Sequence, residues 1–244
     1  MKSRAVDMPV DAWVRDHITQ THGRLYAHCQ GRLSRYPLPA WSGPRGQGGL
    51  FLDLGAGWGR WSLSAAQAGY RVIALDRDPE ALRAARRVAR QFGCDMLCIC
   101  GDAARLPLRS ASVEAVFAYG VHQYLPSAAE PGWLEEIRRV LQAGGWARVQ
   151  LPMAGGLGQR LWPRRDATAY LWPWRQARML CRRYDARIFP EGFFTTNGQW
   201  SDRGLLRWPG RLVVLACQAL RAACQIFPGL SRLADAVWLE LWKI

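Results

Sequence analysis

The chain has 244 residues, 50% of them hydrophobic, so it can bury a substantial core as one elaborated domain or one domain with a small appendage. Its seven cysteines are odd in number and lack the spacing of metal ligands, which argues against a metal site, and the mixed polar start differs from a signal peptide. We therefore expect a cytoplasmic protein. Its net charge of +14 indicates either an anionic substrate, an acidic lipid surface or RNA as partner, or an arginine-rich surface that is only solvated.

The first 47 residues begin with a predicted helix, from Pro9 or Asp11 to about His28. Prolines and glycines then become frequent, from Arg35 to Pro44, and they cannot continue a helix. This part is expected to be an ordered loop or linker that leads into the first strand.

The stretch from Phe51 to Arg60 dominates the sequence. An apolar run ends in three alternate glycines, Gly55, Gly57 and Gly59, and a helical apolar pattern follows, which predicts a strand, a tight turn and a helix. Such turns bind nucleotides, because glycine permits the required backbone angles and lets a ligand contact main-chain N–H groups at the start of the helix. A dinucleotide fingerprint would place its third glycine at position 60, where this chain has arginine.

Strands and helices alternate after this turn. Strands are predicted over residues 70–75, 96–100 and 112–118, and helices from Asp78 and over residues 132–141. This alternation predicts a mostly parallel sheet with helices on both faces, in which ligands sit beyond the carboxyl ends of the strands.

The pattern Asp53-x-Gly-x-Gly-x-Gly resembles motif I of class I S-adenosylmethionine-dependent methyltransferases. Three further segments match in order: Asp76 after the second strand, Gly101-Asp102-Ala103 after the third, and the run from Ile137 to Gly145, which is similar to the family's R-x-L-K-P-G-G. The resemblance covers residues 48–152 as the cofactor-binding core. It implies a Rossmann-like α/β fold with a seven-stranded sheet, and S-adenosylmethionine as the cofactor.

The resemblance also implies which residues contact the cofactor. Asp76 would accept both ribose hydroxyls, since one carboxylate can take two O–H donors, and Asp102 would accept the adenine amino group. The N-terminal segment, residues 1–47, would form a helical cap in which Tyr26, His28, Tyr36 and Trp41 either line the pocket or pack the segment onto the core. The complete set of expected cofactor contacts is Asp53, Gly55, Ala56, Gly57, Gly59, Asp76, Arg77, Asp102, Ala103 and Tyr119.

The chemistry is expected just after the fourth strand, where Tyr119 and His122 are the candidate catalytic residues. Methyl transfer is a displacement at carbon, so the protein mainly aligns the reacting atoms and manages one proton. His122 is the best-placed proton acceptor if the methyl acceptor is a hydroxyl, and the alternative is a polar wall or a packing contact. The Asn/Asp-Pro-Pro-Tyr sequence that resembling enzymes use on exocyclic amines is absent, which disfavours an adenine or glutamine acceptor.

Residues 153–244 are expected to form a substrate-side and C-terminal helical region. They carry 14 basic and six acidic residues, and seven of the 13 tryptophans. A flexible loop from Pro152 to Pro163, a helix after Pro173 and an antiparallel strand over residues 186–194 are predicted. An amphipathic helix over residues 212–227 and a final helix over residues 230–241 complete the chain, and they either contact a lipid surface or stacked ring, or form a substrate lid.

Together these features predict a methyltransferase that acts on a small-molecule acceptor of glycan, lipid-linked or natural-product type. An anionic or lipid-linked acceptor is compatible with this interpretation. A substrate lid is the favoured role of the C-terminal helices, and peripheral contact with the inner membrane surface is the alternative. An RNA methyltransferase is the first alternative, favoured by the basic flanks, although nucleic acid is the less favoured partner. The second alternative is a non-catalytic module that keeps the cofactor fold.

Overall fold

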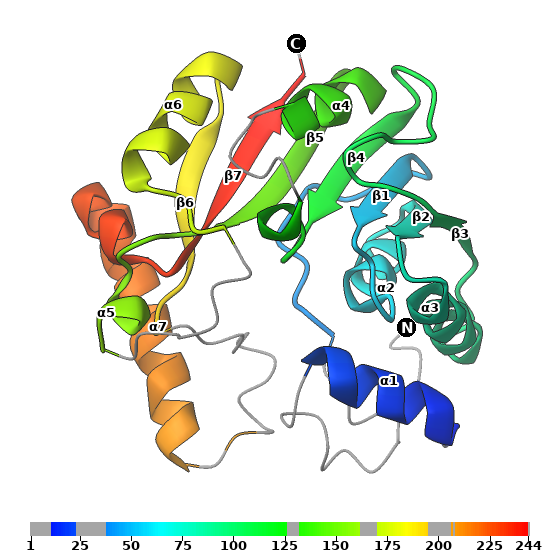
Figure 1. Ribbon diagram of the computed structural model, residues 1–244, viewed down its shortest axis with the longest axis horizontal. Helices are drawn as coiled ribbons and strands as arrows, with labels where there is room; N and C mark the ends of the chain where they lie inside the picture. Colours follow the sequence, from blue (N-terminus) through cyan, green and yellow to red (C-terminus); the bar gives the residue numbers. More distant parts are fainter. Residues whose placement is uncertain are drawn as a thin grey trace.

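A computed structural model describes residues 11–22, 38–125, 132–161, 170–194, 206 and 208–243. Within this part of the chain, seven strands form one sheet in the order β3-β2-β1-β4-β5-β7-β6 (Figure 1). The predicted seven-stranded, mostly parallel α/β sheet is confirmed. The strands are β1 (Leu50–Leu54), β2 (Arg71–Asp76), β3 (Met96–Cys100), β4 (Val113–Ala118), β5 (Leu141–Pro152), β6 (Arg187–Gly192) and β7 (Ala236–Trp242).

The direction of the strands fixes where a ligand can bind. Strands β1 to β5 run parallel, and β7 lies antiparallel between β5 and β6. Strand β1 pairs with β2 on one side and β4 on the other, so that Leu52 lies opposite both Ile73 and Val116. The chain therefore reverses its order across the sheet between β1 and β4, and the crevice beyond their carboxyl ends is the usual ligand position.

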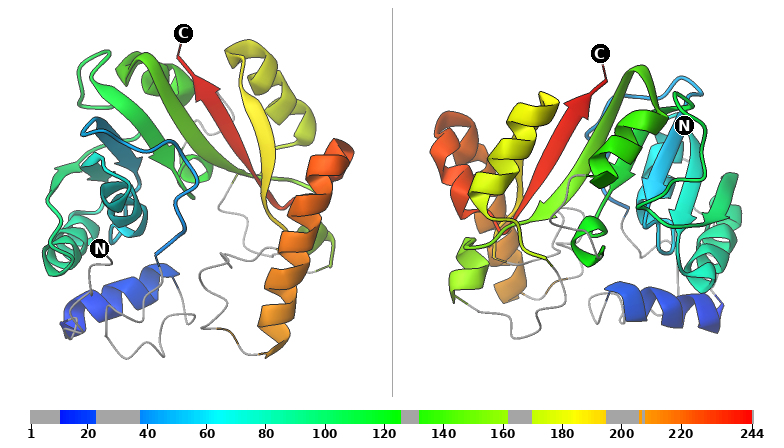
Figure 2. Two further views of the ribbon diagram at one scale, coloured as in Figure 1. Left: turned by 180° about the vertical axis from the view of Figure 1, so that it is seen from behind. Right: turned by 45° about the horizontal axis from the view of Figure 1, so that its top comes forward.

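Helices cover both faces of the sheet (Figures 1 and 2). Leu52, Ile73 and Val116 point to the face covered by α4 and α6, whereas Phe51 and Val72 point to the face covered by α2 and α3. The helices are α1 (Ala12–His22), α2 (Arg60–Gln67), α3 (Pro79–Gln91), α4 (Gly132–Val140), α5 (Leu157–Leu161), α6 (Trp174–Tyr184) and α7 (Trp208–Ile226), with 3-10 turns η4 (His122–Tyr124) and η6 (Pro228–Leu233).

Helix α3 begins as its sequence predicts. The Asp78 side chain accepts a hydrogen bond from the Glu80 backbone N–H at 2.9 Å, and Pro79 occupies the first helical position. The buried stripe includes Leu82, Ala85 and Val88. The exposed side carries arginines, so this helix holds the end of β2 in place without burying charge.

The N-terminal helix α1 packs on α3. Asp11 caps it by accepting from the Val14 N–H at 2.9 Å, and Arg87 of α3 lies 3.3 Å from Asp11 and over the ring of Trp13. The rest of the expected helix, with Tyr26 and His28, lies outside the described residues, and so does Tyr36 of the loop that follows.

Trp41, the fourth aromatic candidate of the N-terminal segment, packs against Phe51, Tyr70 and Trp146. Its indole N–H donates to the Pro44 carbonyl at 2.8 Å. These contacts agree with the packing alternative, because the ring packs on three other aromatic rings and its indole N–H is already hydrogen-bonded.

The prediction of a final helix over residues 230–241 is wrong. Residues 228–233 form η6, and the following residues form β7, the strand between β5 and β6. Val237, Leu239 and Leu241 are buried on one face and Trp238 on the other. A strand buried on both faces has a nearly continuous apolar run, so its residues also satisfied a helical spacing.

Other parts of the C-terminal region agree more closely with expectation. Helices α6 and α7 and the strand β6 are confirmed, and β6 is antiparallel to β7. The loop expected after Pro152 contains the short helix α5, whose Gly158 and Gln159 N–H groups each donate to Asp235 at 2.9 Å.

Candidate cofactor site

The glycine turn after β1 is bonded to the end of β2. The N–H groups of Gly55 and Ala56 donate to the Leu75 carbonyl at 2.8 and 3.1 Å, and the Gly57 N–H donates to the Asp76 carboxylate at 2.9 Å. The structure thereby brings the predicted turn and the predicted acidic residue into direct contact at the carboxyl edge of the sheet.

Two glycines of the turn are required for different reasons. Gly55 has φ +66°, and a Cβ there would lie 2.3 Å from a methyl group of Val121, so no side chain fits. Gly57 has φ +53°, and a Cβ there would meet no atom within 4 Å. The space over Gly57 is therefore open, which is what a ligand that approaches the backbone needs.

The Asp76 carboxylate accepts hydrogen bonds from the backbone of the turn and still has acceptor positions free. One of its carboxylate oxygens accepts from Gly57, and the other accepts from the Asp78 N–H at 3.0 Å. Each carboxylate oxygen can accept more than one hydrogen bond, so capacity remains for two ribose hydroxyls. Arg77, the next residue, is exposed, and Gly59 directly precedes α2.

Asp53 is a buried carboxyl group beneath the turn. It accepts a short hydrogen bond, 2.6 Å, from the Ser62 hydroxyl of α2. Burial raises the pKa of Asp53 to about 7, and the bond from Ser62 opposes this rise only in part. A cationic ligand nearby would stabilise the ionised form, as S-adenosylmethionine would with its sulfonium and ammonium groups. Sequence reasoning missed Ser62, which lies in a helical pattern without any distinguishing neighbour.

The loop between β3 and β4 carries Asp102 and Ala103. Asp102 is exposed and accepts from the Ala104 N–H at 2.9 Å, while Ala103 is buried. The Gly101 N–H donates to the Asp76 carbonyl at 3.1 Å. This bond places the segment that is expected to contact the adenine beside Asp76, the residue that is expected to bind the ribose.

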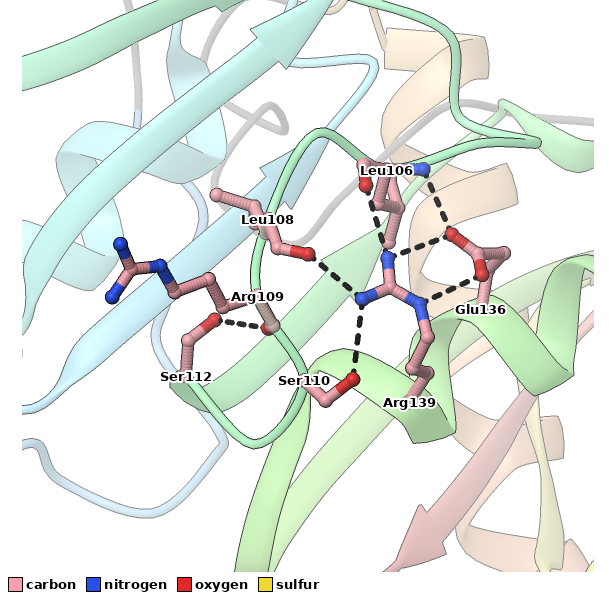
Figure 3. A network of polar contacts seen from close by, with 7 residues as sticks. All are labelled: Leu106, Leu108, Arg109, Ser110, Ser112, Glu136 and Arg139. Atoms are coloured by element: carbon pink, nitrogen blue, oxygen red, sulfur yellow. Dashed lines mark hydrogen bonds and ion pairs between the residues drawn. The ribbon is translucent and has the colours of Figure 1, made fainter.

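A polar network holds that loop on α4 (Figure 3). The Arg139 guanidinium donates to the carbonyls of Leu106 and Leu108 at 3.0 and 2.8 Å and to both carboxylate oxygens of Glu136. Glu136 in turn accepts from the Leu106 N–H at 2.9 Å, and the bonds from Arg139 lower the pKa of Glu136. Arg139 is the arginine of the segment similar to R-x-L-K-P-G-G, and its spacing from Glu136 is the available sequence signal.

Tyr119 and His122 follow β4 but have different surroundings. Tyr119 is partly exposed, and its ring lies 5.8 Å from Trp61 and 5.7 Å from Trp238. His122 is completely buried and lies 4.0 Å from the Trp133 ring of α4, and neither of its nitrogens has a hydrogen-bond partner among the described residues. Burial lowers the pKa of His122 to about 3, so the ring is neutral near pH 7 and is a poor match for proton abstraction there.

A buried polar cluster that sequence reasoning missed lies beside Gly120. A Cβ at Gly120 would be 3.7 Å from the Gln123 amide nitrogen and 3.8 Å from the Gln150 amide oxygen. The Gln150 amide donates to Glu191 at 3.1 Å, and the Gln123 amide oxygen is buried without a partner among the described residues. These groups come from η4, β5 and β6, so local sequence patterns could not unite them.

The described residues hold no group of three or more His, Cys, Asp or Glu side chains arranged to bind a metal ion. None of the described helices is both long enough and apolar enough to cross a membrane.

Residues 51–145 match the family described as "Methyltransferase domain". This match agrees with the strand order and with the geometry of the glycine turn. The match covers less than half of the chain, and over those residues it supports the predicted S-adenosylmethionine-dependent methyltransferase core.

Curated relatives are similar over part of the chain. The biotin biosynthesis bifunctional protein BioHC of Cellvibrio japonicus is 36% identical over 117 residues, which cover 47% of this chain and 22% of that protein. The malonyl-[acyl-carrier protein] O-methyltransferase of Serratia marcescens is 32% identical over 150 residues, 59% of this chain and 56% of that protein. The chain thus spans less than two thirds of these relatives' length.

Solved structures share the fold at low sequence identity. The Haemonchus contortus phosphoethanolamine N-methyltransferase 2, a complex with S-adenosylhomocysteine, superposes with a TM-score of 0.59 and 18% identity, over 94% of this chain and 60% of that one. The [4+2]-cyclase SpnF superposes with a TM-score of 0.57 and 17% identity over 96% of both chains. These likenesses establish the fold alone.

Proposed function

We propose that this chain transfers a methyl group from S-adenosylmethionine to a small-molecule acceptor of glycan, lipid-linked or natural-product type. The observation that carries the proposal is the hydrogen bond from the Gly57 N–H to Asp76, beside open space over Gly57. In this proposal Asp53, Gly55, Ala56, Gly57, Gly59, Asp76, Arg77, Asp102, Ala103 and Tyr119 contact the cofactor.

The acceptor would bind at the buried polar cluster beside Gly120. This residue directly follows Tyr119 at the carboxyl end of β4, where the methyl group of a bound cofactor is expected. Gln123 and Gln150 offer both donors and acceptors to a hydroxyl or amine, and Glu191 positions Gln150 through its hydrogen bond. Such an arrangement supplies alignment, which is the main requirement of a displacement at carbon.

Calorimetric titration tests the cofactor part of the proposal. We expect micromolar binding of S-adenosylmethionine and S-adenosylhomocysteine and no binding of NADH. Asp76→Asn should weaken S-adenosylmethionine binding by about tenfold or more, because a charge-assisted acceptor for the ribose is lost. The matched control is Asp95→Asn, at an exposed position just before β3, which should leave affinity unchanged. Equal affinities of both variants would contradict the ribose role of Asp76.

Turnover separates the remaining alternatives. Label transfer from S-adenosylmethionine into a small-molecule extract supports the proposal, whereas cofactor binding without transfer to any acceptor favours a non-catalytic module. The basic C-terminal residues favour an RNA methyltransferase as the alternative, which would label RNA and bind it with a steep dependence on salt.

The six described cysteines are all free, which supports a reducing, cytoplasmic setting.

A further inference from the structure

Helix α7 turns an apolar stripe toward solvent. Residues four and three apart share one side of a helix, and this spacing runs along the whole of α7. Trp208 is 68% exposed, Leu212 46%, Leu215 48% and Ile226 74%, although a globular helix ordinarily buries such a stripe. The stripe consists of Trp208, Leu212, Leu215, Ala219, Ala222 and Ile226.

The stripe is distinct from the side of α7 that packs on the protein. Val214, Cys217 and Cys224 are buried. The two cysteines belong to the main hydrophobic core, and the Cys217 thiol donates to the Phe193 carbonyl. Among the polar residues of α7, Gln218 and Arg221 are half-buried, whereas Arg211 and Gln225 are exposed. The helix therefore has two apolar sides, and only one of them packs on the core.

An arginine groove adjoins the C-terminal end of this stripe. After Ile226 comes Phe227, 62% exposed, and then η6, which packs beside α6 (Figures 1 and 2). A hollow of about 490 Å³ lies on α6 with Trp174 and Met179 in its wall, and Met179 is 61% exposed. Four arginines complete the lining, and none of them forms an ion pair with another described residue. They are Arg175, Arg178, Arg182 and Arg232.

We propose that α7 and the arginine groove dock on the surface of an anionic phospholipid bilayer. An apolar helix face enters the boundary between headgroups and acyl chains, and neighbouring arginines meet lipid phosphates. RNA would use the arginines but leave the stripe in water. A second copy docked through the stripe would bury the apolar side chains but supply no anionic partner for the arginines of the groove. An anionic bilayer satisfies both features, and its binding does not depend on methyl transfer.

Vesicle sedimentation tests the proposal with the full chain. We expect the protein to bind phosphatidylcholine vesicles that contain phosphatidylglycerol at least about tenfold more tightly than vesicles of phosphatidylcholine alone. High salt should weaken the preference, because screening reduces the attraction between arginines and headgroups.

Paired substitutions assign the binding to the two features. Arg178→Gln with Arg182→Gln should weaken binding to the anionic vesicles by about thirtyfold, since each basic residue near such a surface contributes roughly a factor of five. The control, Arg86→Gln with Arg90→Gln on the exposed side of α3, removes the same charge elsewhere and should change binding by less than about twofold.

The apolar stripe has its own pair. Leu212→Ser should weaken vesicle binding by about tenfold, whereas Leu97→Ser, at a 58% exposed leucine on β3, should have no effect. Circular dichroism checks that each variant keeps its fold.

Several results would overturn the proposal. These are equal affinity for the two vesicle types, no loss on either the arginine or the Leu212 change, and equal loss in the controls. A dimer that Leu212→Ser dissociates, without vesicle binding, would make a second copy the occupant. RNA binding that the Arg178 and Arg182 changes abolish, again without vesicle binding, would make RNA the partner.

Discussion

Replacing Asp53 by asparagine should stabilise the protein at high pH while weakening its cofactor binding. Asparagine keeps the size of the side chain and an oxygen that can accept from Ser62, but it cannot ionise. In the wild type, burial raises the pKa of Asp53 from 3.8 to about 7. The folded protein therefore holds a proton that the unfolded chain releases, and stability is lost as the pH rises from about 4 through 7.

The size of this loss follows from the shift in pKa. A shift of about three units corresponds to roughly 4 kcal/mol in the free energy of unfolding, as an upper figure. Urea denaturation of both proteins at several pH values measures it. The variant should gain on the wild type by up to roughly 4 kcal/mol between pH 4 and pH 8, with most of the gain between pH 5 and pH 7. Any cost of the asparagine amide is independent of pH, so the pH-dependent part of the difference reports on Asp53.

The same group should couple cofactor binding to protons. S-adenosylmethionine favours the ionised carboxylate, so wild-type affinity should rise between pH 6 and pH 8 and the asparagine variant should show little pH dependence. A constant stability difference at all pH values would refute the buried, protonated state of Asp53. Parallel affinity profiles of the two proteins would refute its contact with the cofactor.

Three further substitutions test other parts of the site. Arg139→Lys should weaken S-adenosylmethionine binding by about three- to tenfold in calorimetry, because lysine cannot donate to Glu136 and to two carbonyls together. The control is Arg138→Lys, since the Arg138 side chain lies over the Tyr184 ring. Gly55→Ala should lower the free energy of unfolding by about 3 kcal/mol or more in urea, and Val121→Ala should recover part of this loss, since a Cβ would lie 2.3 Å from the Val121 methyl; additive losses would contradict the clash. His122→Phe should keep or raise stability by about 1 kcal/mol, because it removes two buried nitrogens without described partners, and a marked loss would indicate an essential polar role for the ring.

The cofactor half of the site could be predicted from the sequence because its determinants are local. Gly55 and Gly57 lie within three residues after β1, Asp76 is the last residue of β2, and parallel strands bring their carboxyl ends to one edge. The sheet order extends this logic to Asp102 and Tyr119. What the sequence did not indicate is how these residues are supported, since the bonds from Ser62 and Arg139 depend on helix rotation relative to the sheet.

The C-terminal region was harder to predict because apolar content hides the period of the pattern. β7 is buried on both faces, so its side chains do not alternate between apolar and polar, and a helical spacing fitted them equally well. For α7 the type of element was correct, but an apolar helix does not reveal which of its sides packs on the core. The structure resolves this, since Cys217 and Cys224 are buried while Leu212 and Ile226 are exposed.

Gln123, Gln150 and Glu191 show the corresponding limit for the substrate side. Amide side chains have no motif of their own, and these three residues meet only because β5 is followed by an excursion through α5 and α6 before β6 returns to the sheet. The match to the family model ends at residue 145 and so leaves out Gln150 and Glu191. Under the proposed function, substitutions of Gln123 and Gln150 should weaken binding of the acceptor and leave the affinity for S-adenosylmethionine nearly unchanged.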